Sequence, residues 1–193
     1  MLSACDSLPE LPQRILVAGV SGSGKTTLAA RIAAVLGVPH TEIDSLFHGP
    51  DWTPRESFEH DVEQFSGTAT WTTEWQYNPV RDMLAERADT LIWLDFPTAL
   101  TLSRLIRRTV RRRLRREELW NGNLEAPLHS IFFDPDHIIR WGWQTRNLYR
   151  SRIPALRQSH PGLRIVRLRR QRDVETWVKN LSTTVATGRK AQP

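Results

Sequence analysis

Apolar positions along the chain follow two patterns that alternate from one end to the other. Short apolar or alternating runs predict β-strands at residues 15–18, 69–74, 90–95 and 163–168, with a further short strand that ends at Asp44. Between these runs, apolar residues three or four positions apart predict helices at residues 27–36, 53–65, 78–84, 102–110, 138–156 and 174–181. Strands that alternate with helices indicate an α/β fold, in which helices cover both faces of a parallel sheet.

The composition fits one globular domain. The chain has 193 residues, of which 39% are hydrophobic and 25% are charged, and this length supports a single core. We expect residues 1–183 to form the domain and residues 184–193 to form a loose tail. No apolar run approaches the roughly 20 residues of a membrane-spanning helix, and the N-terminus lacks a signal-peptide pattern. A cytoplasmic protein without a membrane partner is therefore expected.

One eight-residue run carries the strongest chemical signal. Residues 19–26 read Gly-Val-Ser-Gly-Ser-Gly-Lys-Thr and fill every fixed position of the phosphate-binding loop G-x-x-x-x-G-K-[ST]. Its glycines let backbone N–H groups turn toward phosphates at the positive end of the following helix. Lys25 then reaches the β- and γ-phosphates, and the Thr26 hydroxyl can ligate Mg²⁺. The alternative is a tight turn with a structural role only. The residues predicted to bind nucleotide are Gly19, Ser21, Gly22, Ser23, Gly24, Lys25, Thr26 and Thr27.

The excess positive charge is concentrated in one segment. The net charge is +6, and one short stretch without lysine holds Arg104, Arg107, Arg108, Arg111, Arg112, Arg113, Arg115 and Arg116. A guanidinium group can hold two phosphate oxygens at once, which a lysine ammonium cannot do. Two other interpretations compete with phosphate binding, namely a solvated basic helix face and a surface for nucleic acid.

Four pieces of the chain occur in an order that is typical of one group of proteins. They are the phosphate-binding loop, Ile-Asp-Ser-Leu at residues 43–46, the segment 87–97, and the arginine run that leads into residues 118–123. With these pieces the chain, from residue 14 to about residue 177, resembles adenylate-kinase-like P-loop kinases, including short members labelled topology modulation proteins or adenylate-kinase-like ATPases. The resemblance implies a three-layer fold with a five-stranded parallel sheet of order 2-3-1-4-5. It also implies a small helical, arginine-rich lid inserted at about residues 111–137.

The resemblance also implies ATP and Mg²⁺ as cofactors, and it assigns residues to the site. In such kinases, arginines at the edge of a closing lid neutralise the transferred phosphoryl group. Asp44 would orient or deprotonate an acceptor hydroxyl, or would serve only as a helix cap or turn residue. The implied catalytic residues are Lys25, Arg104, Arg108 and Asp44. Further candidates for nucleotide binding are Arg146, beyond the lid, and Arg169, which would stack on the base or lie in a solvated loop.

The chain departs from the family pattern after the third predicted strand. Where adenylate kinases carry Asp-Gly-Phe-Pro-Arg, residues 74–78 read Glu-Trp-Gln-Tyr-Asn, so the arginine expected for a nucleoside monophosphate is absent. Arg81 and Arg55 are the candidates to replace it. Glu74 keeps an acidic residue at the end of the strand. Glu74 and Thr26 are the predicted metal-binding residues. Asp95 follows the next strand as a Walker B acid would, but the strand order favours a helix cap.

These observations favour an ATP-dependent kinase that acts as a monomer or homodimer. Its acceptor would be a small molecule, either a nucleotide or a hydroxyl-bearing metabolite. The alternative is an ATP-dependent regulatory protein whose basic surface binds nucleic acid. The sequence contains no recognisable helix-turn-helix, zinc-finger or RNA-binding motif, and it lacks the Asn-Lys-x-Asp stretch of a GTPase.

Overall fold

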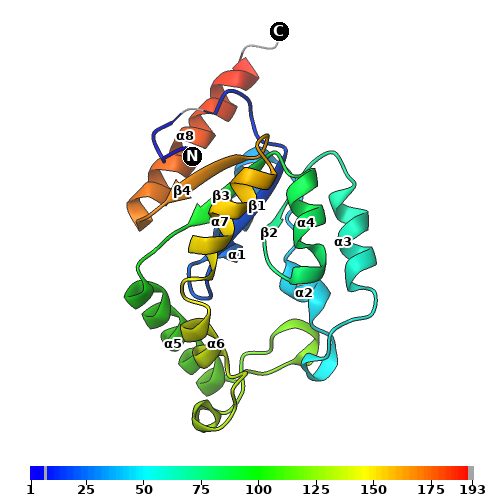
Figure 1. The fold of residues 1–193 in the computed structure, drawn as a ribbon, viewed down its shortest axis with the longest axis vertical. Helices are drawn as coiled ribbons and strands as arrows, with labels where there is room; N and C mark the ends of the chain where they lie inside the picture. Colours follow the sequence, from blue (N-terminus) through cyan, green and yellow to red (C-terminus); the bar gives the residue numbers. More distant parts are fainter. Residues whose placement is uncertain (7, 191–193) are drawn as a thin grey trace.

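A parallel β-sheet forms the centre of the molecule. The computed structural model describes residues 1–6 and 8–190. Within this range four strands pair in the order β2-β1-β3-β4. They are β1 (Arg14–Gly19), β2 (Trp71–Glu74), β3 (Thr90–Leu94) and β4 (Arg164–Leu168). Figure 1 shows the sheet with helices on both sides of it and with α5 and α6 extending beyond it.

The helices alternate with the strands along the chain, as the apolar spacing predicts. Short 3-10 turns occur at Pro50–Trp52, Trp120–Gly122 and Leu128–Phe132. The α-helices of the described residues are α1 (Lys25–Leu36), α2 (Ile43–Phe47), α3 (Phe58–Ser66), α4 (Asn78–Arg87), α5 (Thr98–Arg115), α6 (Ile138–Gln144), α7 (Leu148–Ser159) and α8 (Gln171–Lys190).

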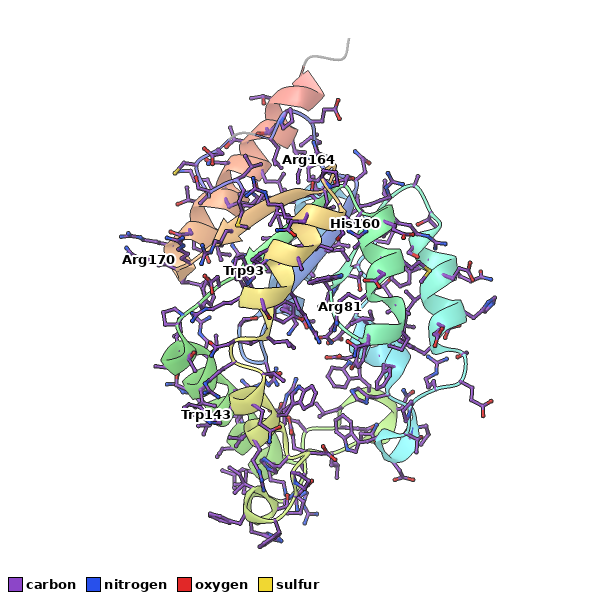
Figure 2. The ribbon with its side chains drawn as sticks, viewed as in Figure 1. Arg81, Trp93, Trp143, His160, Arg164 and Arg170 are labelled. Carbon is purple, nitrogen blue, oxygen red and sulfur yellow. The ribbon has the colours of Figure 1, made fainter. Side chains whose placement is uncertain are left out.

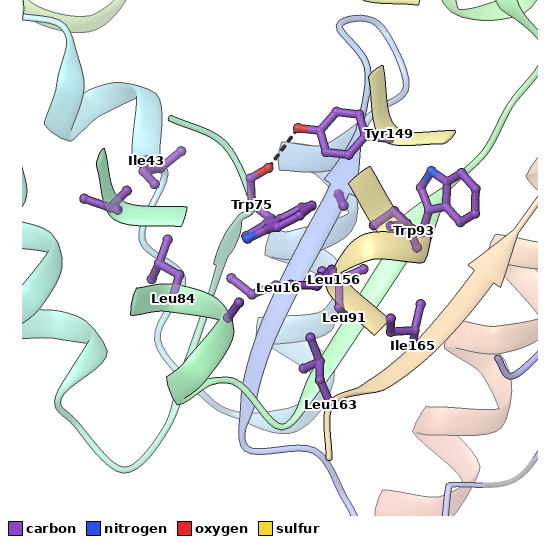
Figure 3. Packing of buried hydrophobic residues seen from close by; sticks show 14 of the residues in the cluster. Leu16, Ile43, Trp75, Leu84, Leu91, Trp93, Tyr149, Leu156, Leu163 and Ile165 are labelled. Atoms are coloured by element: carbon purple, nitrogen blue, oxygen red, sulfur yellow. Dashed lines mark hydrogen bonds between the residues drawn. The ribbon is translucent and has the colours of Figure 1, made fainter. Parts of the chain in front are cut away.

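One face of the sheet packs against α3, α4 and α7. Leu16 and Leu91 point to this face from the two central strands, and both side chains are fully buried. Figure 3 shows part of this cluster, in which the Tyr149 hydroxyl donates a hydrogen bond to the Trp75 carbonyl oxygen at 2.8 Å. Each fully buried side chain of this size contributes about 1.5–3 kcal/mol. The apolar partners from the helices include Phe58, Val62, Val80, Leu84, Ile153 and Leu156.

The other face packs against α1 and α8. Ile15 and Val17 alternate with Leu16 along β1 and therefore point the opposite way, where they are completely buried. Their partners on the helices include Leu28, Ile32, Val174, Trp177 and Leu181. The molecule is thus a three-layer α/β structure, as the sequence predicts.

The prediction of a strand that ends at Asp44 is wrong. The sheet of the described residues has four strands, whereas five were expected. In the described part of the chain, a single bridge between His40 and Thr72 occupies its place beside β2. The next available amide, the N–H of Ile43, donates instead to the Glu74 carboxylate at 3.0 Å. Because a side chain takes over this amide, the ladder stops and the chain turns into α2. The order of the other four strands agrees with the predicted order.

Several boundaries also differ from the sequence prediction, and the helix expected from residue 53 begins only at Phe58, with Ser57 as its N-cap residue. The helix expected over residues 138–156 is divided into α6 and α7, and the Thr145 hydroxyl caps α6 by donating to the Trp141 carbonyl oxygen at 2.7 Å. Residues 184–190, predicted as part of a loose tail, continue α8. Val185 lies there beside Leu11 of the N-terminal segment, so this part of the helix has apolar surroundings. Residues 191–193 lie outside the described residues.

The loop after β1 is packed directly against α5 at Gly22. Its φ is +80°, and a Cβ atom on Gly22 would lie 2.2 Å from the carbonyl oxygen of Thr101 and 3.0 Å from Cβ of Leu105. Gly24 has a similar φ of +93°, but no atom lies within 4 Å of the corresponding Cβ position. Both glycines are required by backbone conformation, and only Gly22 is also required by the contact with α5.

Replacement of these glycines separates the two requirements. Gly24→Ala should lose about 1–2 kcal/mol of unfolding free energy, because an L-residue is strained at this φ. Gly22→Ala should lose about 1–3 kcal/mol more, because its methyl group also overlaps the backbone of α5. Urea unfolding of both variants measures the difference, and equal losses would contradict the close contact.

Candidate functional site

The phosphate-binding loop joins the end of β1 to the start of α1. Ser23 is buried, and its hydroxyl has no hydrogen-bond partner within the described residues. The Lys25 ammonium lies 3.5 Å from the Val20 carbonyl oxygen, which is a weak contact. Burial lowers the pKa of Lys25, and the carboxylates of Asp44 and Glu74 oppose that effect. The Ser23 hydroxyl and the Lys25 ammonium are therefore available to donate hydrogen bonds to a ligand.

A pocket of about 300 Å³ opens beside this loop. Arg104 forms part of its wall: its guanidinium donates to Gln171 Oε1 at 3.0 Å and lies 5.5 Å from the centre of the Phe96 ring. The pocket thus combines phosphate-binding backbone with an aromatic ring and guanidinium groups. Its lining comes from the loop, α1, the end of β3, α5 and α8, and comprises Gly22, Ser23, Gly24, Thr27, Leu28, Arg31, Leu94, Phe96, Arg104, Arg108, Gln171 and Val174.

Arg108 connects the pocket to the acidic residues. Burial and the neighbouring Arg112 lower its pKa, whereas Glu125 and Asp44 oppose the shift. Its Nε is buried and has no hydrogen-bond partner in the described part of the chain. A guanidinium that is desolvated and unpaired carries an energetic penalty that an anionic ligand would relieve. Its positive charge contributes to the lowered pKa of Lys25, and it lines the pocket together with Gly22, Ser23 and Gly24 of the loop.

The other arginines of α5, together with Arg116 directly after it, divide into two sets. Arg112 pairs with Glu125 at 3.4 Å, and Arg113 donates to the Glu125 carbonyl oxygen at 3.2 Å. Arg111 pairs with Glu117 at 3.2 Å. These contacts hold the segment after α5 against the helix. The second set, Arg107, Arg115 and Arg116, is exposed to solvent.

Asp44 lies in α2 and is held by the segment after β2. Tyr77 donates its hydroxyl hydrogen to Asp44 Oδ1 at 2.6 Å, and the Gln76 side-chain amide donates to the same oxygen. Nε2 of His48 lies 3.1 Å from the Tyr77 hydroxyl oxygen. Because the single Tyr77 hydrogen is given to Asp44, His48 must be the donor in this pair. Burial lowers the pKa of His48, which favours the neutral ring.

Tyr77 holds this position through an unusual backbone conformation. Its φ of +60° lies in the left-handed region, which a bulky residue rarely adopts. Its ring is stacked on Phe47 with centroids 3.9 Å apart. Burial and the negative charge of Asp44 raise the pKa of Tyr77, so the hydroxyl stays protonated and remains a donor. The orientation of Asp44 therefore depends on a strained and well-packed neighbour.

Glu74 lies at the end of β2 and is nearly inaccessible to solvent. One oxygen accepts from the Ile43 N–H at 3.0 Å, and the other lies 3.2 Å from His40 Nε2. Burial alone would raise the pKa of Glu74, but these two interactions outweigh burial and lower the pKa. The carboxylate is thus ionised, close to Lys25, and already hydrogen-bonded on both oxygens.

An aromatic contact closes the far side of the site. The loop around Trp120 meets the loop around Trp52, and the His48 ring stacks on Trp120 with centroids 5.8 Å apart. Asn123 locks the two loops together: its amide nitrogen donates to the Gly49 carbonyl oxygen at 2.8 Å, and its amide oxygen accepts from the Trp52 N–H at 3.0 Å. These tryptophans therefore belong to a loop-to-loop contact beside Asp44.

The residues of the loop fit an ATP–Mg²⁺ complex. The unpaired Ser23 hydroxyl and the Lys25 ammonium are donors suited to phosphate oxygens. Thr26 stands in the first turn of α1, where its hydroxyl could ligate Mg²⁺. No group of three or more His, Cys, Asp or Glu side chains in the described residues could hold a metal ion by itself. A metal here would therefore share its ligands with the phosphates.

The backbone arrangement matches solved kinase structures. A gluconokinase from Sinorhizobium meliloti aligns with a TM-score of 0.53 at 18% identity, over 95% of this chain and 99% of that one. A shikimate kinase from Acinetobacter baumannii, solved with shikimate, gives a TM-score of 0.54 at 14% identity, over 91% and 94% of the two chains. The chain has the fold of these kinases. No protein-family model and no curated protein matches its sequence.

Together with these neighbours, the loop after β1 and the parallel sheet fit a P-loop NTPase fold. Among residues 1–6 and 8–190, no helix combines the length and apolar character needed to cross a membrane.

The structure brings most of the sequence-predicted residues together, but not all of them. Arg146 folds back onto α6, where it donates to the Trp143 carbonyl oxygen at 2.7 Å and lies over the Trp143 ring. The backbone amide of Arg169 is bound by Asp173, and its side chain is exposed and does not line the pocket. Figure 2 shows the adjacent Arg170 at the outer edge of the molecule.

The prediction that Asp95 caps the next helix is wrong. Pro97 is the N-cap residue of α5. Asp95 forms ion pairs with Arg150 at 3.2 Å and with Arg167. It therefore fixes α7 against the ends of β3 and β4.

Sequence reasoning missed several residues of the site, among them four polar ones. Arg31 and Gln171 line the pocket, and Gln76 and Tyr77 orient Asp44. For the second pair a signal was available, because they directly follow Glu74 at the carboxyl end of a strand, where sites of parallel sheets form.

The charge on Glu74 should be visible in the pH dependence of stability. Its pKa in the folded state lies below the ordinary value of 4.5, so the carboxylate stabilises the fold above that pH, and this contribution is lost as the pH falls through the lowered value. At pH 7, Glu74→Gln should lose about 1–3 kcal/mol. The gap to wild type should narrow as the pH falls below 4.5.

Urea unfolding across this range measures the gap. Glu86→Gln, at an exposed position on α4, is the control and should show almost no gap at any pH. A Glu74→Gln gap that stays constant or widens in acid would contradict the assignment.

Proposed function

We propose that the chain is an ATP- and Mg²⁺-dependent kinase that phosphorylates a hydroxyl group of a small molecule. The observation that carries this proposal is that Arg108 lines one pocket with the phosphate-binding loop, while the charge of Asp44 opposes the lowering of the Lys25 pKa by burial. Phosphoryl transfer needs positive charge at the phosphates and a group that positions the nucleophile. This site offers both.

Lys25 and Arg108 would neutralise the transferred phosphoryl group from two sides. ATP would supply that group, and Mg²⁺, held with it by Thr26, would add positive charge at the phosphates. Lys25 belongs to the loop, whereas Arg108 belongs to the helix that leads into the segment we propose as a lid, at about residues 111–137. The unpaired Nε of Arg108 gains a partner only when an anion is bound, which suits a residue that acts on the phosphate.

Asp44 would act on the acceptor. Its Oδ1 already receives two hydrogen bonds, from Tyr77 and Gln76, so Oδ2 is the oxygen left to receive a hydroxyl hydrogen. Removal of that proton makes the acceptor oxygen a better nucleophile. The contact between the loops of Trp52 and Trp120 limits the access of water from this side, which protects the phosphoryl group from hydrolysis.

A hydroxyl acceptor agrees better with this arrangement than a nucleotide phosphate does. A phosphate oxygen is already deprotonated at neutral pH and needs no base, whereas a hydroxyl does. The two solved neighbours support a small-molecule acceptor, since one is a gluconokinase and the other a shikimate kinase holding shikimate.

The base role of Asp44 can be tested with two matched substitutions. Asp44→Asn should lower the maximal rate of phosphoryl transfer by about 100-fold or more, because the amide cannot take the hydroxyl proton. ATP affinity should be unchanged, since Asp44 belongs to the acceptor side. Asp51→Asn, at an exposed position in the next loop, should leave the rate unchanged.

The assay measures acceptor-dependent ADP release with a panel of sugar acids, other hydroxylated metabolites and nucleoside monophosphates. The same panel identifies the acceptor class. An Asp44→Asn rate close to wild type, on whichever acceptor is used, would show that the reaction needs no base and would overturn the hydroxyl assignment.

A further inference from the structure

His48 connects Asp44 to the contact between the loops of Trp52 and Trp120. It directly follows α2, one helical turn after Asp44, and its backbone N–H donates to the Asp44 carbonyl oxygen at 3.0 Å. The Tyr77 hydroxyl oxygen lies between the two side chains, 2.6 Å from Asp44 Oδ1 and 3.1 Å from His48 Nε2. A continuous chain of hydrogen bonds therefore runs from the His48 ring to the proposed base.

The direction of this chain depends on which ring nitrogen of His48 carries the hydrogen. Burial lowers the pKa of His48, so the ring is neutral and two forms compete. With the hydrogen on Nε2, the ring donates to Tyr77, and the single Tyr77 hydrogen is left for Asp44. With the hydrogen on Nδ1, Nε2 becomes an acceptor and competes with Asp44 for that hydrogen.

The surroundings of Nδ1 favour the first form. This nitrogen of His48 is buried, and no hydrogen-bond partner for it exists among the described residues. A hydrogen on Nδ1 would therefore be a buried donor without an acceptor, which is costly. The Nε2–H form avoids that cost and secures the hydrogen bond from Tyr77 to Asp44.

Three aromatic rings surround the His48 ring and fix its orientation. Trp120 is stacked on it at an interplanar angle of 23°, whereas Trp52 and Phe47 lie nearly perpendicular to it, with centroid distances of 4.9 and 5.1 Å. Rotation of the ring about its Cβ–Cγ bond would turn Nε2 away from Tyr77, and close packing opposes such a rotation. Phe47 and Trp52 are near His48 in the sequence, but Trp120 comes from the segment after α5.

Side-chain amides hold the same segment against the backbone at His48. The Asn121 amide donates to the His48 carbonyl oxygen, and the Asn123 amide donates to the carbonyl oxygen of Gly49. Figure 1 shows the two segments meeting below α2. The position of His48 is thus tied to residues 118–124.

We propose that His48 is a positioning residue, which transmits the contact with residues 118–124 through the Tyr77 hydroxyl to Asp44. While the contact is formed, Trp120 keeps Nε2 directed at Tyr77, and Tyr77 holds Oδ1 of Asp44, so that Oδ2 faces the acceptor. When residues 118–124 move away, the His48 ring is free to rotate, and Asp44 loses this fixed donor. The base is then oriented only while the two loops exclude water, which limits hydrolysis of ATP.

This inference rests on the proposed kinase function for its meaning, but the chain of hydrogen bonds can be tested without phosphoryl transfer. Long-range ¹H–¹⁵N NMR spectra of histidine-labelled protein distinguish Nε2–H rings from Nδ1–H rings, and a His48→Gln variant identifies the His48 signals by their absence. Wild-type His48 should show the Nε2–H pattern. Trp120→Ala should give a mixture of both forms, because it removes the ring that orients His48. The exposed His60 on α3 should give the same signals in both proteins.

Two substitutions of His48 separate its hydrogen bond from its packing. His48→Phe keeps an aromatic ring between Trp52 and Trp120 but removes the donor, whereas His48→Gln loses the ring and keeps an N–H near the position of Nε2. His48→Phe should lower kcat about tenfold, which corresponds to about 1.4 kcal/mol, and leave KM for ATP unchanged. The loss stays moderate because the Gln76 amide still donates to Asp44. His48→Gln should recover most of the rate.

A second substitution shows whether His48 acts through Tyr77. The double variant of Tyr77→Phe and His48→Phe should be no slower than Tyr77→Phe alone, because the chain of hydrogen bonds is already broken at Tyr77. His60→Gln, at an exposed position on α3, is the matched control and should behave as wild type.

Three results would overturn the role of His48. The first is a wild-type spectrum with the Nδ1–H form, or one that Trp120→Ala leaves unchanged. The second is a rate of His48→Phe that equals or exceeds that of His48→Gln, as packing alone would give. The third is a double variant in which the two losses add. A protein that passes the NMR test but phosphorylates no acceptor would retain this connection and lose the kinase function, so the two failures are distinguishable.

Discussion

The structure depends on the contact between the phosphate-binding loop and helix α5. At Gly22 the loop lies so close to Thr101 that no side chain fits between them. Leu105, one turn later, is fully buried and also packs against Gly142 of α6, where a Cβ atom would lie 2.4 Å from its Cδ2. The loop, α5 and α6 are therefore fixed to one another. This contact sets the position of Arg104 and Arg108 relative to the loop, and helix geometry directs the arginines of α5 toward the pocket, the segment after α5 or solvent.

Charge is distributed in the site so that each group has a separate task. The cations of Lys25 and Arg108 face the phosphate side, and both lose solvation without a tight ion pair in the described residues. The carboxylate of Glu74 is used inside the fold, where it ends the β-ladder and holds α2. Asp44 is held by neutral donors on one oxygen only. One acid thus maintains the structure, and the other remains available for chemistry.

The sequence predicted the elements whose signals are local. The loop motif, the order of four strands and the helical spacing that brings Arg104 and Arg108 to one pocket all follow from short-range patterns. The strand before Asp44 could not be ruled out locally, because it fails only when the distant Glu74 side chain binds the Ile43 amide. The position of the Arg146 side chain depends on its contact with Trp143.

The central claim is that the loop and Asp44 serve one phosphoryl transfer from ATP to an acceptor hydroxyl. The most direct measurement follows the reaction by ³¹P NMR, with ATP, Mg²⁺ and the acceptor panel, for wild type and Lys25→Ala. Wild type should convert the γ-phosphate into a new phosphate ester, whereas Lys25→Ala should form almost none of it while its circular-dichroism spectrum stays unchanged. Lys179→Ala, at an exposed position on α8, should behave as wild type. Transfer at a near-normal rate by folded Lys25→Ala would contradict the claim.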